Sequence, residues 1–152
     1  ESANLSLGGN VYVMGSNPED GDPWRVGLKD PEDEQQIVGY LDLEDQSVVT
    51  SGDYERYFEE NGRRYHHIFD PQTGWPADQG LESVTIISAD SSMADCYSTA
   101  LFVMGLEEGL ALCEGREDFG AIFITSDREV FVTENLRDQF VLTAEDREYH
   151  YG

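Results

Sequence analysis

The period of the hydrophobic pattern changes near residue 90, and this change restricts the folds that the chain can adopt. Up to residue 88, short apolar runs are separated by turn residues, a pattern typical of β-strands. Between residues 92 and 104 the apolar side chains recur at helical spacing, at Met93, Tyr97, Ala100, Leu101 and Met104. A second short helix is expected at Leu106–Cys113. The chain is therefore predicted to fold as α+β, a mostly antiparallel sheet with a helical pair late in the sequence.

Strand boundaries follow from the turn residues. We expect single strands over residues 5–14, 24–28, 81–88 and 140–142, the last before a polar tail. Within the first, Gly8-Gly9 is interpreted as a bulge or a point of close backbone approach. Three hairpins are expected to pair residues 37–43 with 48–51, 54–59 with 63–69, and 121–125 with 130–133. Asn61-Gly62 is the strongest of the turn signals, and residues 70–80 are expected to form a loop.

The charge of the chain excludes two classes of partner. Its 152 residues carry 32 acidic and 9 basic side chains, a net charge of −23, and Lys29 is the only lysine. Nucleic acid and anionic membrane surfaces both require a basic patch, so neither is expected as a partner. The acidic residues are interpreted either as a solvated surface suited to salty surroundings or, in part, as ligands that collect a cation. With 39% hydrophobic residues, the chain can form one domain with its own core.

Cys96 and Cys113 lack the close spacing of zinc ligands. Both fall in apolar helical runs, so buried free thiols are expected, and a disulfide between them stays open. The chain has no run of about 18 apolar residues, so no membrane-spanning segment is expected.

Asp95 and Thr99 lie four residues apart in the first predicted helix, which stacks a carboxylate and a hydroxyl on one face. Apolar neighbours flank that face, so the helix is expected to be buried almost all round. One interpretation is a capping box formed by Ser92 and Asp95. The other is a hard cation, magnesium or calcium, held by Asp95 and Thr99 beside a phosphate group at the helix N-terminus.

The stretch RYHHIFDPQTGWP, residues 64–76, contains two of the three histidines. In a strand, His66 and His67 point to opposite faces, which places His67 with Tyr65 and Phe69. A histidine in that setting is either a hydrogen-bonded structural residue or, because a turn follows, a functional side chain. Asp-Pro and Thr-Gly in this stretch are chiefly turn chemistry.

Two glycine-containing segments could approach an anion. The small polar segment Thr50-Ser51-Gly52-Asp53 could present backbone N–H groups to an anion or could form only a turn. Leu7-Gly8-Gly9-Asn10 lacks both the dinucleotide-binding and the P-loop glycine spacing.

Six segments, in this order, resemble the ApbE-type FAD:protein FMN transferases: LSLGGNVYVMG, PWRVGLKDP, VVTSGDYERYF, YHHIFDPQTGWPA, SVTIISAD and MADCYSTALFVMG. HHIFDPQTG followed by ADCYSTALFVMG is the most specific part. The resemblance covers residues 5–142 and corresponds to the second half of the family's domain. It implies that residues 1–152 are the C-terminal portion of a T-fold-like flavin transferase domain whose N-terminal FAD-binding half is missing. The start at Glu1 is interpreted as that of a fragment or a processed product.

The resemblance implies an Mg²⁺-dependent enzyme that binds FAD and moves its FMN half onto a threonine or serine of an acceptor protein. The new bond is a phosphoester, and AMP is released. Asp95 and Thr99 match the metal-binding aspartate and threonine of the family. Ser98 stands where some members have a second acidic ligand, and we expect it in the metal site as well. Magnesium would offset the charge of the diphosphate, which the acidic chain cannot do with lysines.

The same resemblance assigns roles near the two histidines. His67 matches the histidine that is a candidate for activating the acceptor hydroxyl, and His66 is expected to be its outward-facing neighbour. Ile68 and Phe69 match the segment that lies against the flavin nucleotide. The segment Ser51-Gly52-Asp53 is expected to bind the cofactor.

The acceptor implied by the resemblance is a flavoprotein subunit of electron transport, and the parent protein would be extracytoplasmic and lipid-anchored. This chain alone is expected to bind FAD poorly and to be inactive. Two alternatives from other classes stay open: a non-catalytic FAD- or FMN-binding module, and an acidic interaction domain without chemistry. A transferase should require His67 and Asp95, whereas a binding module should tolerate the loss of His67.

Overall fold

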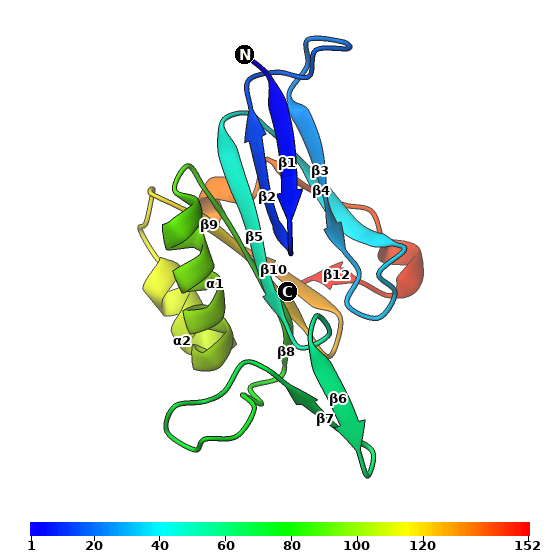
Figure 1. The fold of residues 1–152 in the computed structure, drawn as a ribbon, viewed down its shortest axis with the longest axis vertical. Coiled ribbons are helices and arrows are strands. Elements are labelled where there is room, and N and C mark those ends of the chain that lie inside the picture. The colour runs from blue at the N-terminus through cyan, green and yellow to red at the C-terminus, as the bar shows by residue number, and fades with distance from the viewer.

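Seven strands form the central sheet in the spatial order β1-β2-β5-β8-β9-β10-β12 (Figure 1). The computed structural model describes residues 1–152, the side chain of Arg63 excepted. The strands of this sheet are β1 (Ala3–Leu7), β2 (Asn10–Met14), β5 (Gln46–Gly52), β8 (Leu81–Ser88), β9 (Gly120–Thr125), β10 (Glu129–Val132) and β12 (His150–Tyr151). Neighbouring strands are antiparallel except β10 and β12, which are parallel. The predicted α+β class with a mostly antiparallel sheet is confirmed.

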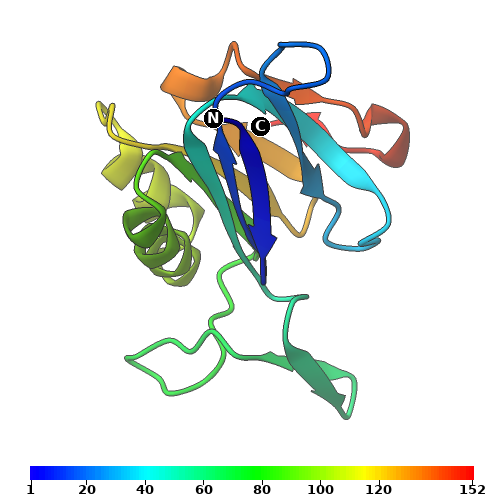
Figure 2. The same cartoon turned by 45° about the horizontal axis from the view of Figure 1, so that its top comes forward.

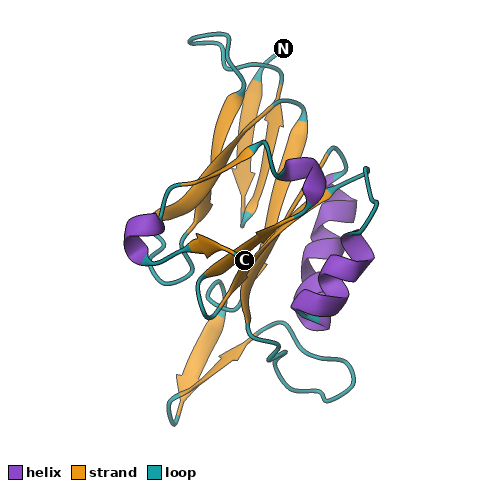
Figure 3. Cartoon of the chain, turned by 180° about the vertical axis from the view of Figure 1, so that it is seen from behind, coloured by secondary structure: helices purple, strands orange, loops and turns teal.

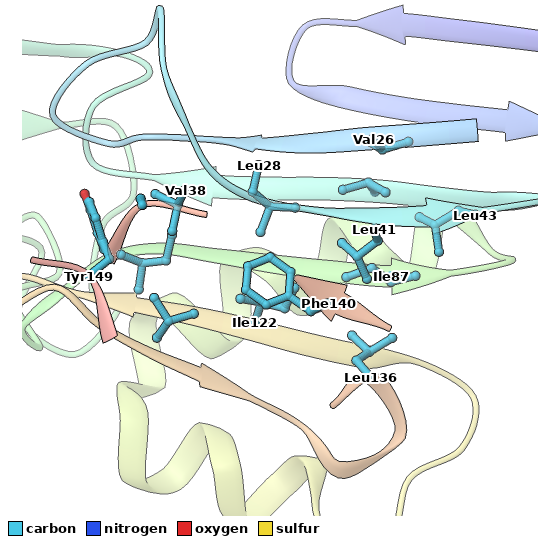
Figure 4. Close-up of a cluster of buried hydrophobic side chains, with 14 of the residues drawn as sticks. Val26, Leu28, Val38, Leu41, Leu43, Ile87, Ile122, Leu136, Phe140 and Tyr149 are labelled. Atoms are coloured by element: carbon cyan, nitrogen blue, oxygen red, sulfur yellow. The ribbon is translucent and has the colours of Figure 1, made fainter. Parts of the chain in front are cut away.

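A three-stranded sheet covers one face of the central sheet (Figure 2). It consists of β3 (Trp24–Lys29), β4 (Ile37–Leu43) and β11 (Phe140–Leu142), in the order β11-β4-β3. Side chains from both sheets enclose a hydrophobic cluster in which Leu41, Ile122 and Phe140 are almost completely buried (Figure 4). Two 3₁₀ turns, Glu134–Leu136 and Glu145–Arg147, lie on either side of β11 in the chain.

Two helices cover the opposite face of the central sheet (Figure 3). They are α1 (Ser91–Met104) and α2 (Leu106–Cys113), as the sequence predicts. A second hydrophobic cluster, with Leu101 and Phe102 of α1, lies between the helices and the sheet. Because both faces are covered, all six residues of β9 are buried. Neither helix has the length and apolar content that a membrane-spanning helix requires.

Helix α1 differs from the prediction in its cap and its burial. The N-cap is Asp90, whose Oδ1 accepts hydrogen bonds from the N–H groups of Ser92 and Met93. The predicted capping box of Ser92 and Asp95 is therefore wrong, because the helix begins one residue earlier than expected. The helix is also not buried all round, since one face packs on the sheet while Asp95, Cys96 and Thr99 are exposed. Both cysteines are free, but only Cys113 is buried.

Two predicted strand arrangements are wrong. Residues 5–14 form a hairpin of β1 and β2, in which Gly8-Gly9 is the turn rather than a bulge. A Cβ atom on Gly9 would lie 2.8 Å from Glu55 Oε1, which is the end of a flexible side chain and not a backbone atom. Strands β4 and β5 do not pair with each other: the chain crosses from the smaller sheet to the central one between them. The sequence pattern shows the turn between them but cannot show that the chain changes sheets there.

A hairpin projects from the body of the molecule (Figure 1). Strands β6 (Tyr57–Glu60) and β7 (Arg63–His66) pair around Asn61-Gly62, where both residues have positive φ, as this tight turn requires. The loop after β7 returns the chain to β8. We call residues 54–80, which contain the hairpin and this loop, the arm.

Candidate functional site

A cluster of three hydroxyl groups joins the end of β5 to α1. The Oγ atom of Ser51 lies 2.9 Å from Ser98 Oγ and 3.1 Å from Thr99 Oγ1. Alternation along β5 directs Ser51, like Val49, toward the helices, where α1 crosses the sheet. Ser51 and Ser98 are 47 residues apart in sequence, yet their side chains are in contact. Ser51 was predicted to bind the cofactor, and Ser98 and Thr99 were predicted to bind the metal.

Asp95 lies one helical turn before Thr99 on the exposed side of α1. Its carboxylate has no hydrogen-bond or ion-pair partner among the described residues, so its oxygens face solvent. Ser98 is completely buried, and its Oγ also donates a hydrogen bond to the backbone oxygen of Asp95 at 3.0 Å. The Ser98 hydroxyl therefore links Ser51 to the backbone of α1 at Asp95, next to Thr99, through two hydrogen bonds.

The side-chain oxygen atoms of Asp95 and Thr99 are suitable ligands for a hard cation. A carboxylate from Asp95 and a hydroxyl from Thr99 are oxygen ligands of the kind that magnesium takes, and magnesium commonly completes its shell with water and substrate phosphate oxygens. In the described part of the chain, no group of three or more His, Cys, Asp or Glu residues gathers as a metal site. Asp95 and Thr99 therefore fit as two oxygen ligands of a hard cation.

The two adjacent histidines have opposite environments. His66 is only 6% exposed: its Nε2–H donates to the backbone oxygen of Ala77 at 3.0 Å, and its Nδ1 accepts from the Ile68 N–H at 3.3 Å. Its ring also meets Phe102 of α1 edge-on, with 5.7 Å between the ring centroids. The expectation that His66 faces outward is wrong, because the Phe102 ring of α1 packs against the His66 ring and covers it. Both ring nitrogens of His66 are occupied.

His67 is exposed and lies just beyond the end of β7. Its Nδ1 lies 3.3 Å from the backbone oxygen of Arg56. A carbonyl oxygen can only accept a hydrogen bond, so Nδ1 carries the proton of the neutral ring. The Nε2 atom then keeps a lone pair and has no partner among the described residues. His67 is therefore the histidine of this pair that can take up a proton from a ligand. The described residues show no contact between His67 and Asp95 or Thr99.

The residues after His67 form a fixed turn. Ile68 is buried and Phe69 is exposed, which confirms the predicted alternation of faces. Asp70 Oδ1 accepts from the Gln72 N–H at 2.8 Å, and its Oδ2 accepts from the Thr73 hydroxyl at 3.1 Å. Asp70 thus acts in the turn, as its sequence context predicts. The turn holds Phe69 outward beside the candidate base.

The segment Ser51-Gly52-Asp53 is held tightly. A Cβ atom on Gly52 would lie 2.6 Å from the Tyr54 ring, so only glycine fits there. The Asp53 N–H already donates to the backbone oxygen of Glu82 at 3.1 Å and is not open to an anion. The Asp53 carboxylate pairs with Arg64 of the arm at 3.0 Å. This segment therefore offers the Ser51 hydroxyl toward α1, while Asp53 turns toward the arm.

The pKa values of several groups around this segment are shifted upward. Burial raises the pKa of the Glu82 carboxyl to about 7, and the carboxylate of Asp53 adds to the rise. Burial also raises the pKa of the Glu55 carboxyl and, well above its usual range, that of the Tyr54 hydroxyl. The side chains that follow the end of β5 and those at the start of β8 are thus poorly solvated.

Two features of this region were not predicted. The contact of Ser51 with Ser98 and Thr99 joins distant segments, which leave no periodic signal in the sequence. Glu82, the second residue of β8, was not predicted as a site residue either. A charged residue next to the buried run of β8 was the one available signal for that position.

Comparisons with known proteins agree on one family. The ApbE family matches residues 1–123. The FAD:protein FMN transferase of Klebsiella pneumoniae is 47% identical over 141 residues, and the match covers 92% of this chain and 42% of that protein. The protein of the same name from Treponema pallidum is 40% identical over 147 residues, covering 91% of this chain and 41% of that protein.

Solved structures give the same result. The ApbE protein of Thermotoga maritima matches with a TM-score of 0.81 and 37% identity, covering 91% of this chain and 44% of that one. The flavin transferase ApbE of Vibrio cholerae matches with a TM-score of 0.75 and 30% identity, covering 90% of this chain and 43% of that one. The chain thus spans less than half the length of these relatives.

Proposed function

The chain belongs to the ApbE family, and from this premise we propose that it is the C-terminal portion of an FAD:protein FMN transferase. The relatives from Klebsiella pneumoniae and Treponema pallidum carry that name. The reaction would move the FMN half of FAD onto a threonine or serine hydroxyl of an acceptor protein. An open histidine nitrogen on the arm and a cluster of oxygen ligands where β5 meets α1 support this reaction.

The transfer is balanced without any further reactant. The acceptor oxygen attacks the phosphorus atom of the FMN half, forming a phosphoester. The bond between that phosphorus and the bridging oxygen breaks, and AMP leaves with the electron pair. The hydroxyl proton passes to a base, and no atom is oxidised or reduced.

We assign the role of the base to His67. The open Nε2 atom of His67 is the observation on which the proposal depends most. Its Nδ1–H is held by the Arg56 backbone oxygen, which leaves the Nε2 lone pair available. Histidine is the side chain that most often serves as a general base in enzymes. His66 cannot take this role, because both of its nitrogens are already used.

Asp95 and Thr99 are proposed to hold magnesium. When bound, the ion would offset the negative charge of the FAD diphosphate. The hydrogen bonds between the Ser51 hydroxyl and those of Ser98 and Thr99 hold the Thr99 hydroxyl beside the end of β5. Ile68, Phe69 and the Ser51-Gly52-Asp53 segment are proposed to line the flavin nucleotide.

Mass spectrometry of an acceptor protein tests the activity. The whole protein would be incubated with FAD, magnesium and a flavoprotein subunit of electron transport, which we propose as the acceptor. The acceptor should gain the mass of FMN minus water, and Asp95→Ala should abolish this gain. Full transfer by Asp95→Ala would remove Asp95 from the site, and an acceptor of unchanged mass would overturn the reaction.

We propose further that residues 1–152 alone do not transfer FMN. They cover only 42% of the Klebsiella pneumoniae relative, and the family resemblance assigns most of the FAD pocket to the remainder. Titration of FAD with magnesium into this chain, followed by flavin fluorescence, should show weak binding or none. Tight binding would contradict this division of the site.

The family resemblance also leads us to propose an extracytoplasmic, lipid-anchored parent protein. Cell fractionation with detection of the whole protein tests this location. Recovery in the cytoplasmic fraction would contradict it.

A further inference from the structure

Two carboxylate oxygens are buried without a partner in the same pocket. Among the described residues, Asp53 Oδ1 and Glu82 Oε2 are two of four buried side-chain atoms that have no hydrogen-bond partner. Both residues line a pocket of about 340 Å³ between the end of β5, the start of β8 and the arm. Buried polar atoms are almost always paired, so two unpaired acceptors in one pocket require an explanation.

The two residues are also joined through their backbones. The Asp53 N–H donates to the Glu82 carbonyl oxygen at 3.1 Å, which closes the last step of the β5–β8 pairing. The other carboxylate oxygen of Asp53 pairs with Arg64 Nη1 at 3.0 Å. Asp53 is therefore joined to β8 through its backbone N–H and to the arm through one carboxylate oxygen.

Other charged groups surround this pair. Glu32 and Asp30, from the chain after β3, add negative potential at Glu82, and Arg64 of β7 opposes it. His66 and Asp78 of the arm line the same pocket. Tyr54, which follows Asp53, and Tyr149 are both influenced by the Glu82 charge. Glu32 and Asp30 have their own cations, Arg128 and Arg147, whereas Arg64 is the cation that acts on Glu82. Two ionised carboxylates that line one pocket would repel each other.

We propose that Glu82 is a positioning residue: its protonated carboxyl group donates a hydrogen bond to Asp53 Oδ1 and so fixes the junction between β5, β8 and the arm. One proton then satisfies both unpaired oxygens. It also leaves Asp53 Oδ2 directed at Arg64. The upward shift of the Glu82 pKa to about 7 agrees with a carboxyl group that is neutral in slightly acidic solution.

The junction between β5, β8 and the arm connects two parts of the candidate site. Ser51, two residues before Asp53, belongs to the hydroxyl cluster with Thr99. Three residues after Arg64 in the arm is His67. The Asp53–Glu82 pair therefore sets the position of the candidate base relative to the candidate metal ligands. The shared proton does not depend on the proposed function, but its effect on FMN transfer does.

Hydrogen exchange measured by mass spectrometry on the whole protein tests the shared proton without flavin or acceptor. After correction for the intrinsic rate, exchange in peptides that cover residues 51–67 should rise about tenfold between about pH 6 and about pH 8, the effect of losing one hydrogen bond. In Glu82→Gln the side-chain amide donates at every pH, so exchange should stay slow and independent of pH. Glu59→Gln, an exposed carboxyl of the same arm, is the matched control and should behave as the wild type.

A second measurement reads the proton directly. The Glu82 carboxyl carbon, followed by NMR, should titrate near pH 7, and Asp53→Asn should move that midpoint down because a neighbouring negative charge is lost. FMN transfer by the wild type should fall as the pH rises above about 7, and Glu82→Gln should abolish this fall. A Glu82 midpoint at its ordinary value, or equal exchange in wild type and Glu82→Gln at both pH values, would overturn the proposal. If exchange and titration behave as expected while no acceptor gains FMN, the proposed function fails and the shared proton stands.

Discussion

At the scale of single residues, neighbouring side chains of one type have separate tasks. His66 and His67 are adjacent, yet one is locked between the Ala77 carbonyl and the Ile68 N–H while the other presents a free nitrogen. The difference arises because alternation along β7 turns one ring toward Phe102 of α1 and the other toward solvent. Mutating each histidine should therefore damage a different property.

We expect His67→Ala to lower the rate of FMN transfer by about 10²–10⁴-fold while the melting temperature changes little, since only the base is lost. His66→Ala should instead destabilise the protein by about 2–3 kcal/mol, because two hydrogen bonds and the contact with Phe102 disappear. Transfer assays and urea denaturation measure the two effects. His150→Ala, at the exposed third histidine, is the control for both. A reversed pattern, with His66→Ala stable but inactive, would contradict the assignment.

The pH dependence of stability should depend on Glu82. Its folded-state pKa of about 7 lies above the ordinary value of 4.5, so the folded protein holds the proton more tightly than the unfolded chain. This stabilisation is complete below about pH 4.5 and is lost as the pH rises through about 7. Glu82→Gln should therefore gain about 1–2 kcal/mol over the wild type at about pH 8, after a discount for partial solvation, and little at about pH 4.5.

Urea denaturation of the wild type and of Glu82→Gln at both pH values measures this gain. The exposed substitution Glu59→Gln removes the same charge from a solvated position, and it corrects for the net charge of the chain. Equal gains from the two substitutions at about pH 8 would show that burial of Glu82 has no effect on stability.

At the scale of elements, local patterns predicted most segments, and long-range pairing was the main source of error. Both helices and the strands β3, β8 and β11 were predicted close to their observed bounds, because each has a local signal in turn residues or periodicity. The hairpin around Asn61-Gly62 was predicted at the right turn, but its strands are shorter at their outer ends than expected. The chain crosses between sheets after β4, and β12 pairs through only two residues. Neither the crossing after β4 nor the strand β12 has a local signal in the sequence, so neither was predicted.

The candidate site was predicted unevenly for the same reason. Asp95 and Thr99 were placed together because i, i+4 spacing fixes their face of the helix. The choice between His66 and His67 as the exposed residue depended on which face of β7 a distant helix covers. The contact of Ser51 with Thr99 depends on β5 and α1 crossing, which only the tertiary structure defines.

The N-terminus of α1 gives a prediction at this scale. Asp90→Ala should reduce the free energy of unfolding by about 1 kcal/mol, because the N–H groups of Ser92 and Met93 lose their acceptor. Ser92→Ala should change it much less, since the Ser92 side chain does not cap the helix. Chemical denaturation of both variants measures the difference. A larger loss for Ser92→Ala would restore the capping box that the sequence suggested.

At the scale of the whole molecule, acidic side chains far outnumber basic ones. The net charge is −23, and the arginines Arg25, Arg64, Arg116 and Arg128 already pair with carboxylates. Few cations are left to offset the remaining carboxylates. Repulsion among them opposes the compact state and depends on the ionic strength.

Sodium chloride should therefore stabilise the protein. Raising the salt from about 0.1 M to about 1 M shortens the Debye length from about 10 Å to about 3 Å. We expect the melting temperature to rise by about 5 °C, which corresponds to about 1–2 kcal/mol for a chain of this size. Circular dichroism during heating measures the change, and sucrose at equal osmolality is the uncharged control. A melting temperature that stays constant or falls with salt would contradict the role of repulsion.

The pairing of β4 with β11 has a consequence for synthesis on the ribosome. Leu41 faces Phe140, and the buried Tyr149 hydroxyl donates to Asp30, so the smaller sheet needs residues from both ends of the sequence. At about 5–20 residues per second, β4 waits roughly 5–20 s before β11 is translated. During that interval Leu41 and its apolar neighbours have no cover from β11. The nascent chain is then most exposed to aggregation, and a ribosome-bound chaperone would have its greatest effect there.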